Sequence, residues 1–444
     1  MIDSPPMLRR LLAVAVLVLA AGLSARADDP EAPELVPGRH IPKTVEAQAK
    51  TPEKSSETPW IARWMLRPRP RGIFIRLPIM DTDPNRGITG GVMPIWVLQG
   101  ATDDRIEQIH APSLTYNRNF KLIPTYRYYY YPQEDASLVA RASVSKYERE
   151  AMGEYIDGSV GGTPYDILVR VQFNVDAGQR FYGFGPDSKK GAEANYKEDY
   201  WQYRWGIGTP VVKDSKWRVG ISEHYQAGRF LDGPLDNLTR FSSAYPGQYS
   251  DLRQQTNETR ATLLFDSRDH AVTTGKGHYF ETYAEGSKKG FLSMYDYTRY
   301  GADYRWFKPW PNDKGKVFAV QTKYEQLLGR TPPFWLLPRL GGKYSLRAYG
   351  DGRYIDRGMA IVNVEQRIKF FEERMGGVTT EFQLAPFAGL GTVFDNPGAA
   401  SAKFVRPVVG AGVRAVAKPQ VVGSIDFGVG REGLAVFMDI NYSF

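Results

Sequence analysis

The chain ends in Leu434-Ala435-Val436-Phe437-Met438-Asp439-Ile440-Asn441-Tyr442-Ser443-Phe444, and this stretch decides the fold class. Every second residue from Leu434 to Phe444 is apolar, whereas Asp439, Asn441 and Ser443 occupy the other parity. Side chains alternate between the two faces of a β-strand, so the stretch predicts one apolar and one polar face. An aromatic residue beside a terminal carboxylate fits a soluble core badly, because the charge would need water. It fits the rim of a membrane barrel, where aromatic side chains form an interfacial belt.

The first residues have the pattern of a secretory signal peptide. Arg9 and Arg10 precede an apolar run over residues 11–23, and Ala25-Arg26-Ala27 supplies the small residues of a cleavage site. This run is shorter than the roughly 20 residues of a membrane-spanning helix, which disfavours an uncleaved anchor. We therefore expect residues 1–27 to be removed. Residues 28–69, rich in Pro and charge, are expected to be a flexible periplasmic leader, and residues 70–444 the barrel.

Composition narrows the class further. The 444 residues include no Cys, which excludes disulfides and thiolate metal sites. The 27 Tyr and 9 Trp pair an apolar body with a polar tip, which favours a membrane–water boundary. The net charge of +8 is spread along the chain without a basic stripe, so we expect no nucleic-acid partner. The five His lack metal-ligand spacing, and we expect neither a metal nor a cofactor.

An alternating pattern runs from about residue 87 to the end of the chain. In residues 358–370, apolar Val362, Val364 and Ile368 oppose Glu365 and Arg367. A charge at every second position cannot face lipid and would face a wet lumen, and strands this long exceed the usual soluble length of about 5–6 residues. The pattern predicts an all-β, 16-stranded antiparallel transmembrane barrel. Its strands are expected at 87–99, 106–116, 119–132, 136–147, 164–176, 200–212, 217–229, 257–266, 277–286, 294–308, 316–328, 358–370, 378–394, 405–417, 422–430 and 434–444.

The connections between these strands differ in length. Those at 177–199, 230–256 and 329–357 are long and are expected on the extracellular side. Most connections on the other side are short. The segment 148–163 breaks this rule, because it is long for a periplasmic turn, so either strand 4 or strand 5 is misplaced or the turn is unusual.

A family resemblance is carried by Leu337-Pro338-Arg339-Leu340-Gly341-Gly342-Lys343-Tyr344-Ser345-Leu346-Arg347-Ala348-Tyr349-Gly350 and by Asn363-Val364-Glu365-Gln366-Arg367. Both stretches resemble the BamA/TamA superfamily of outer-membrane barrels, the bacterial surface antigen family. In that family a long loop between strands 11 and 12 folds into the lumen, and its Arg pairs with acids on strands 12 and 13. The expected loop 329–357 has the same place. Residues 181–188, 266–269 and 386–395 resemble further motifs of the family.

The resemblance implies roles for individual residues. Arg347 matches the lumen Arg and Glu365 its partner on strand 12, so we expect these two side chains to pair. The family's Gly after the Arg is Ala348 here, and its strand-13 acid is Gly389, so the pairing should be weaker or shared with another acid. The loop motif also includes Leu346, Ala348, Tyr349 and Gly350. Ile440, Tyr442 and Phe444 match the signal that barrel-assembly machinery reads.

The resemblance also implies a function and a location. The chain is expected in the bacterial outer membrane, in contact with its lipids, as a barrel that passes or inserts a partner molecule, with protein or lipid as cargo. Residues 28–86 lack the pattern of the periplasmic POTRA modules of larger family members. A general porin-like channel is the alternative. An outer-membrane lipid-modifying enzyme is a third reading, with His224, Arg218 and Ser222 on one strand face, although we expect no catalytic residues.

The signal peptide and the terminal strand predict where the protein is found. The mature chain, starting at Asp28, should fractionate with the outer membrane. It should also migrate faster in gels when unheated than when boiled, because a folded barrel resists detergent. Recovery as a soluble periplasmic species would contradict this prediction.

The terminal aromatic residue predicts an effect on assembly. Deleting Phe444 should lower the amount of heat-modifiable barrel in the membrane, because the apolar C-terminal signal is then incomplete. Densitometry of the unheated band, against a deletion in the leader such as residues 50–55, measures this. Unchanged levels of folded barrel would count against the assembly role.

Overall fold

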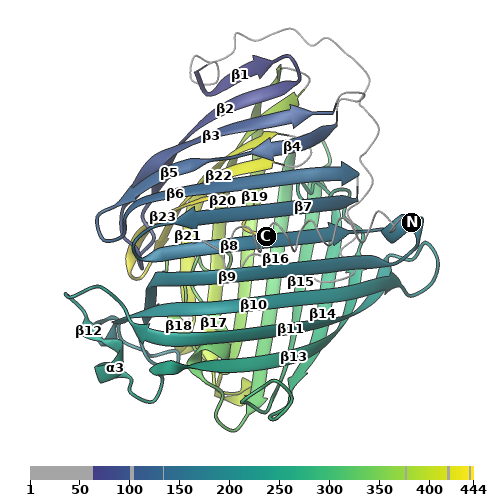
Figure 1. Ribbon diagram of the computed structural model, residues 1–444. Coiled ribbons are helices and arrows are strands. Elements are labelled where there is room, and N and C mark those ends of the chain that lie inside the picture. Colours follow the sequence, from purple (N-terminus) through teal and green to yellow (C-terminus); the bar gives the residue numbers. More distant parts are fainter. Residues whose placement is uncertain (1–63, 101–104, 134, 376–377, 418–420, 440–441) are drawn as a thin grey trace, which may run out of the picture.

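The computed structural model describes residues 64–100, 105–133, 135–375, 378–417, 421–439 and 442–444 (Figure 1). Within these residues the fold is all-β, as expected, and 21 strands form one sheet. Consecutive strands pair antiparallel, apart from a short parallel contact between β10 and β12. No described helix has the length and apolarity to cross a membrane. The expected signal peptide and almost all of the expected leader lie outside the described residues.

The strands of the large sheet follow the chain order. They are β1 (Leu66–Arg69), β2 (Gly72–Asp81), β3 (Thr89–Gln99), β4 (Ile106–His110), β5 (Ser113–Asn117), β6 (Lys121–Gln133), β7 (Ala136–Val144), β8 (Glu148–Asp157), β9 (Asp166–Phe181), β10 (Ala194–Pro210), β11 (Trp217–Asp232), β12 (Thr239–Arg240), β13 (Ser250–Asp266), β14 (Gly277–Ser287), β15 (Tyr297–Trp310), β16 (Asp313–Gly329), β19 (Gly358–Met375), β20 (Val378–Phe394), β21 (Arg406–Ala417), β22 (Val421–Gly430) and β23 (Gly433–Asp439).

Short elements lie in the connections. They are the helix α3 (Phe241–Ala244), the 3-10 turns η1 (Val160–Gly162), η2 (Lys190–Ala192), η3 (Phe334–Leu336), η4 (Pro397–Ala399) and η5 (Ala402–Phe404), and a two-stranded sheet of β17 (Arg339–Leu340) and β18 (Tyr354–Ile355).

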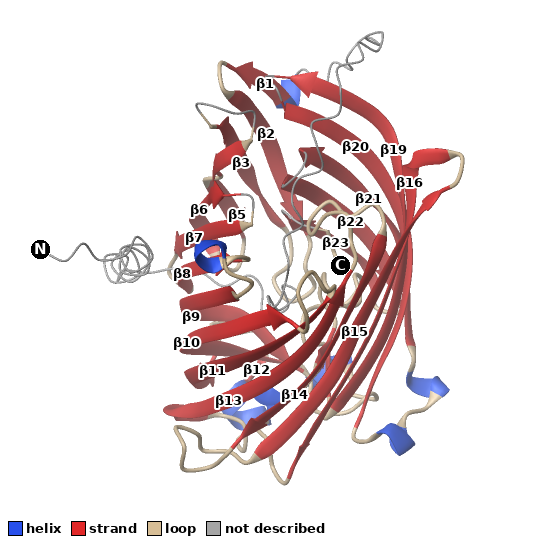
Figure 2. Cartoon of the chain, turned by 90° about the vertical axis from the view of Figure 1, so that its right-hand side faces the viewer, coloured by secondary structure: helices blue, strands red, loops and turns tan. Residues whose placement is uncertain are grey.

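The sheet curls until its two ends meet (Figures 1 and 2). β2 returns beside β23, where the amide of Thr82 donates to the carbonyl of Val436 at 2.8 Å. The hydroxyl of Thr82 accepts from the amide of Val436 at the same distance. These bonds join the first and last parts of the sheet and make the structure a barrel.

The structure has more strands than the alternation predicted. β2 and β8 were missed, residues 106–117 divide into β4 and β5, and β1 and β12 are too short to recognise. β2 was missed because it does not alternate cleanly, its inner face being apolar where Ile73, Ile75 and Leu77 pack in a buried cluster. β8 was missed because its charges favoured a loop. It lies within 148–163, and its presence explains why that segment was too long for a turn.

The outer face of the barrel wall is apolar and the inner face is polar, as a membrane barrel requires. On the outer face, Val219, Ile221 and Leu263 are exposed apolar side chains on neighbouring strands. On the inner face, Arg260 and Glu285 are buried and paired at 2.6 Å. Inward polar residues alternate with outward apolar ones because the strand period is two.

The C-terminus departs from the expected strand 434–444. β23 ends at Asp439, and Tyr442 and Phe444 are buried inside the barrel rather than on its outer face. The cause is Arg367, whose guanidinium lies 3.7 Å from the centre of the Tyr442 ring and donates to the carbonyl of Phe444 at 3.0 Å. A local pattern could not foresee this partner. Ile440 lies outside the described residues, and the role of these residues in assembly stays a prediction.

Candidate functional site

The connection between β16 and β19 enters the barrel (Figure 2). It covers residues 330–357, here called the lumen loop, and its strands β17 and β18 pair Arg339 with Ile355 and Leu340 with Tyr354. This small hairpin holds residues 341–353 together as one compact turn. Leu346, Arg347 and Tyr349 of this turn are almost completely buried.

The guanidinium of Arg347 lies against the barrel wall. Its Nη1 donates to the Oε2 of Glu365 at 2.7 Å and to the hydroxyl of Ser443 at 3.2 Å. The guanidinium also stacks 3.6 Å from the centre of the Phe387 ring, which adds a cation–π contact in a dry place. The structure thus brings together the two residues, Arg347 and Glu365, that the family resemblance singled out.

Further charged groups extend this pair into a network. Arg414 on β21 donates to Glu365 at 3.1 Å and pairs with Asp426 on β22 at 2.7 Å. Arg367 donates to the other oxygen of Glu365 at 3.1 Å. Three guanidiniums therefore surround two carboxylates, and each charge has partners although the group is buried. A buried charge is tolerated only when it is paired in this way.

Asp426 supplies the second acid that the sequence lacks at Gly389. Its Oδ2 lies 3.5 Å from Nη1 of Arg347, on β22 rather than on the strand where the family carries its acid. A side chain at position 389 would require the Asn363 side chain to move, because a Cβ there would overlap its amide oxygen. The pairing is therefore shared with another acid, one of the two outcomes that the sequence allowed.

The lumen loop touches the wall through glycine. A Cβ at Gly428 would overlap the carbonyl oxygen of Arg347, and one at Gly430 would lie 3.0 Å from Ala348 and Tyr349. Because glycine has no side chain, β22 lets the loop approach its backbone directly. The hydroxyl of Tyr349 accepts from the amide of Arg431 at 3.1 Å and fixes the loop at the end of this strand.

The apolar residues of the loop motif pack against the wall. Leu346, Ala348 and Tyr349 belong to a buried cluster with residues of β19, β20 and β21, among them Ile361 and Phe387. Gly350 faces Asn85, and a Cβ there would overlap that side chain. The side chains of Leu346, Ala348 and Tyr349 thus pack between the loop and the wall, and Gly350 is small enough for its close contact with Asn85.

An aromatic cap holds the outer part of the lumen loop. Phe334 packs with ring centres 4.8–5.5 Å from Phe181 on β9, Tyr196 on β10, Phe230 on β11 and Phe241 on α3. Trp335 stacks on Phe230 at 5.2 Å. Rings at these distances contribute roughly 0.5–1.5 kcal/mol per pair beyond their buried area.

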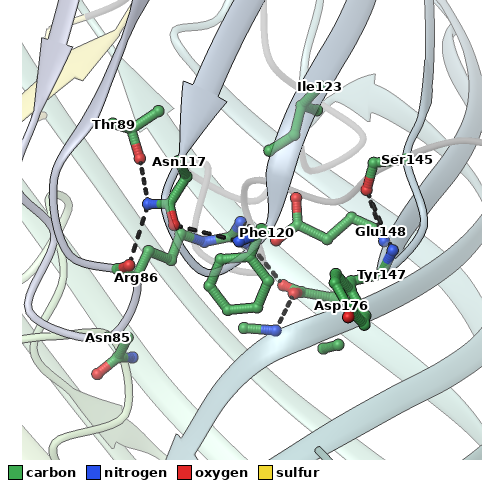
Figure 3. Close-up of polar contacts among 12 residues, drawn as sticks. Asn85, Arg86, Thr89, Asn117, Phe120, Ile123, Ser145, Tyr147, Glu148 and Asp176 are labelled. Carbon is green, nitrogen blue, oxygen red and sulfur yellow. Dashed lines mark hydrogen bonds and ion pairs between the residues drawn. The ribbon is translucent and has the colours of Figure 1, made fainter. Parts of the chain in front are cut away.

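A second loop reaches inward from the turn between β2 and β3 (Figure 3). The guanidinium of Arg86 pairs with Glu148 on β8 and with Asp176 on β9, the latter at 2.7 Å. The amide of Asn117 donates to the carbonyl of Arg86 at 3.0 Å and to the hydroxyl of Thr89 at 2.9 Å, and so fixes the turn.

The second loop also contacts the lumen loop. The side-chain amide of Asn85 donates to the carbonyl of Asp351 at 2.7 Å. Burial raises the pKa of the Asp351 carboxyl to about 6, and the nearby carboxylate of Asp83 acts in the same direction. Arg353 is bound on the far side, where it donates to Glu432 at 2.7 and 3.0 Å. The lumen loop is therefore held by contacts with several parts of the barrel.

A cavity of about 240 Å³ remains beside the lumen loop. Its lining includes His224, Glu258, Arg299, Trp335 and Arg339. Charges of both signs face this space from the wall, and the lumen loop contributes the apolar residues 335–338 together with Arg339, Tyr344 and Ser345.

The residues considered for catalysis do not assemble into one site. Nε2 of His224 lies 2.7 Å from the Oε1 of Gln202, and Nδ1 lies 3.8 Å from Glu258. Arg218 pairs with Asp166 at the other end of the strand. Among the described residues, no group of three or more His, Asp or Glu is placed to hold a metal ion.

Sequence reasoning missed Arg414, Asp426, Asn85 and Arg86. The first two lie within the expected strands 405–417 and 422–430, whose alternation does not show which residues meet inside the barrel. Asn85 and Arg86 belong to a turn that carried no signal, because the contacts join residues far apart in the chain. These roles become visible only in the structure, where side chains that are far apart in the chain pair inside the barrel.

A barrel of this kind, with a long loop held in its lumen by a buried arginine, defines a class of outer-membrane proteins. Residues 136–430 match the model of the Omp85 superfamily domain. The chain therefore belongs to the Omp85 superfamily, which contains the BamA-like barrels that the sequence resembled, and its fold is that of an outer-membrane transport barrel.

Two solved structures are similar to this chain, and the first of them shows the same fold. CdiB from Escherichia coli is 10% identical over 78% of this chain and 64% of its own, with a TM-score of 0.52. BamA from Haemophilus ducreyi lacking POTRA domains 1–3 is 14% identical over 82% of this chain and 73% of its own, with a TM-score of 0.49. The chain thus spans less than two thirds of this CdiB. No curated protein sequence matches the chain.

The network predicts how the lumen loop is released. Replacing Arg347 by Ala should leave the barrel heat-modifiable but free the loop, because Glu365 and Asp426 then lose a buried partner, a loss that costs about 3–5 kcal/mol. Cleavage near Arg353 by trypsin added outside should become faster. Gly428→Val should do the same by steric overlap with no change of charge.

A matched control for these variants lies in the same loop. Arg357 pairs with Asp395 and donates to the carbonyls of Gly329 and Arg330 at 2.9 and 3.0 Å. These groups lie near the solvent, and exposed ion pairs contribute about 0–1 kcal/mol. Arg357→Ala should therefore leave the cleavage rate near that of the wild type. Equal protection of all three variants would show that the Arg347 network does not hold the loop.

Proposed function

We propose that this protein moves or inserts a partner protein at the outer membrane, and that the lumen loop is the plug of its resting state. The observation that carries the proposal is the buried network of Arg347, Glu365, Arg414 and Asp426. Membership of the Omp85 superfamily supports a transport role.

A plug that is held by ion pairs can be released by a partner that carries a matching charge. An ion pair can exchange one partner for another of the same charge, whereas the apolar contacts of the loop around Phe334 and Tyr349 must separate when it moves. A cargo segment that brings a carboxylate to Arg347 would replace Glu365 without leaving a buried charge unpaired, which is the costly alternative. The network therefore couples movement of the loop to the arrival of a charged partner.

The geometry disfavours the porin reading. A general porin leaves a continuous aqueous channel. Here the aromatic cap around Phe334, the lumen loop and the turn carrying Asn85 all enter the lumen (Figure 2). An open channel would require these segments to move. The resting protein should therefore conduct poorly.

Single-channel recording in planar bilayers tests this proposal. The wild type should show low, rare conductance, whereas Arg347→Ala should open more often because the plug is loosened. Lys213→Ala, an exposed residue in the turn between β10 and β11, is the control and should behave as the wild type. Steady, large conductance by the wild type would instead identify a porin. Identical traces for Arg347→Ala and the wild type would contradict the plug.

A further inference from the structure

A charged patch lies on the outer face of the barrel, away from the lumen. It is formed by Lys197 and Asp199 on β10, Arg229 on β11 and Arg253 on β13, and is here called the outer patch. These strands are neighbours in the sheet, and in Figure 1 they run side by side toward α3 and β12. The register places Asp199 directly opposite Arg229.

Strand alternation shows that the outer patch faces away from the lumen. Glu198 and Tyr200, on either side of Asp199, line the inner cavity, as do His224 and Gln226 on β11. Residues of the opposite parity therefore point outward. The side chains of Arg229 and Arg253 are 39% and 43% exposed, as an outward position requires.

The charges of the outer patch do not balance. Arg229 pairs with Asp199, and Nη2 of Arg253 lies 3.6 Å from the same carboxylate, which is only 12% exposed beneath them. Lys197 adds a third cation. Exposed Asp251, two residues from Arg253, adds a second anion, so cations still exceed anions. The Nε of Arg229 has no hydrogen-bond partner.

An aromatic belt lies next to the outer patch on the same wall. The ring of Trp201 is 38% exposed and lies 5.0 Å from that of Tyr225, which stacks on Tyr203 at 5.5 Å. Exposed Tyr and Trp mark the interface between lipid and water. A second group, Trp217 and Phe265, marks the opposite rim of the same strands.

The outer patch therefore lies just beyond the outer interface. The long connections, such as the lumen loop, identify this rim as the extracellular one. On the membrane side of the belt, outward Glu223 accepts from Nε1 of Trp205 at 3.0 Å and from the amide of Asn257 at 2.7 Å, so its carboxylate is hydrogen-bonded.

We propose that the outer patch binds the phosphate of an outer-leaflet lipid, with Arg229 and Arg253 as the phosphate-binding residues. Guanidiniums bind phosphate through paired, charge-assisted hydrogen bonds, and the excess positive charge is available for a phosphate anion. Exposed Trp201 then lies beside the upper part of the acyl chains. This site is independent of the lumen loop, so it holds or orients the barrel whether or not the plug is closed.

Native mass spectrometry of the purified full chain in detergent tests this site. The probes are diphosphorylated lipid A, the same lipid without its phosphates, and inorganic phosphate. The wild type should bind diphosphorylated lipid A, and Arg229→Gln with Arg253→Gln should weaken that binding about tenfold or more. Lys213→Gln with Lys216→Gln, exposed at the opposite rim, is the matched control and should bind as the wild type.

Each outcome decides the proposal. Loss of binding in the arginine variant and for the dephosphorylated lipid, with the control unchanged, supports it. Equal binding by the arginine variant, equal binding of both lipids, or full displacement by inorganic phosphate would overturn it. Heat-modifiable migration reports whether the variant is folded. If the double variant does not fold, Arg253→Gln alone, which removes the more exposed guanidinium, should still weaken binding.

Discussion

The buried ion network around Arg347 is the interaction on which the rest of the lumen depends. A long loop loses much conformational entropy when it is ordered, and the contacts that hold it must exceed that cost. Glu365 and Asp426 bind the loop from two different strands, while Arg414 and Arg367 keep these carboxylates paired from the wall. Because the group is dry, removing any one charge exposes the others to a large penalty. The network therefore behaves as one unit.

The remaining features arrange the barrel around this unit. Gly428 lets the loop backbone touch β22, the Phe334 cluster closes the outer side, and Asn85 joins the loop to a second inward turn. The C-terminal residues also turn inward, because Ser443 and Phe444 bond to Arg347 and Arg367. The end of the chain is thus part of the same network as the plug. Movement of the loop and the position of the C-terminus are physically linked.

The replacement of one acid by another shows how the network tolerates change. The resemblance implied a second acid at position 389, which is Gly389 here, beside the side chain of Asn363. Asp426 reaches Arg347 from a different strand, and Arg414 joins Asp426 to Glu365. What is retained is the charge near the guanidinium, not the position in the sequence. Electrostatic contacts allow this because they depend on distance and burial rather than on which strand carries the charge.

The sequence by itself determined the all-β barrel, most of its strands and the pair Arg347 and Glu365. Strand alternation and a local motif can both be recognised from residues that are close together in the chain. It failed for β2, whose inner face is apolar where a lumen is usually polar, and for β8, whose charges resembled a loop. Only the tertiary structure decided that Asp426 is the second acid, that Arg86 crosses to Glu148 and Asp176, and that Tyr442 and Phe444 turn inward. Each of these contacts depends on a partner that closure of the barrel brings near. A local sequence pattern does not show which distant residues will lie close together.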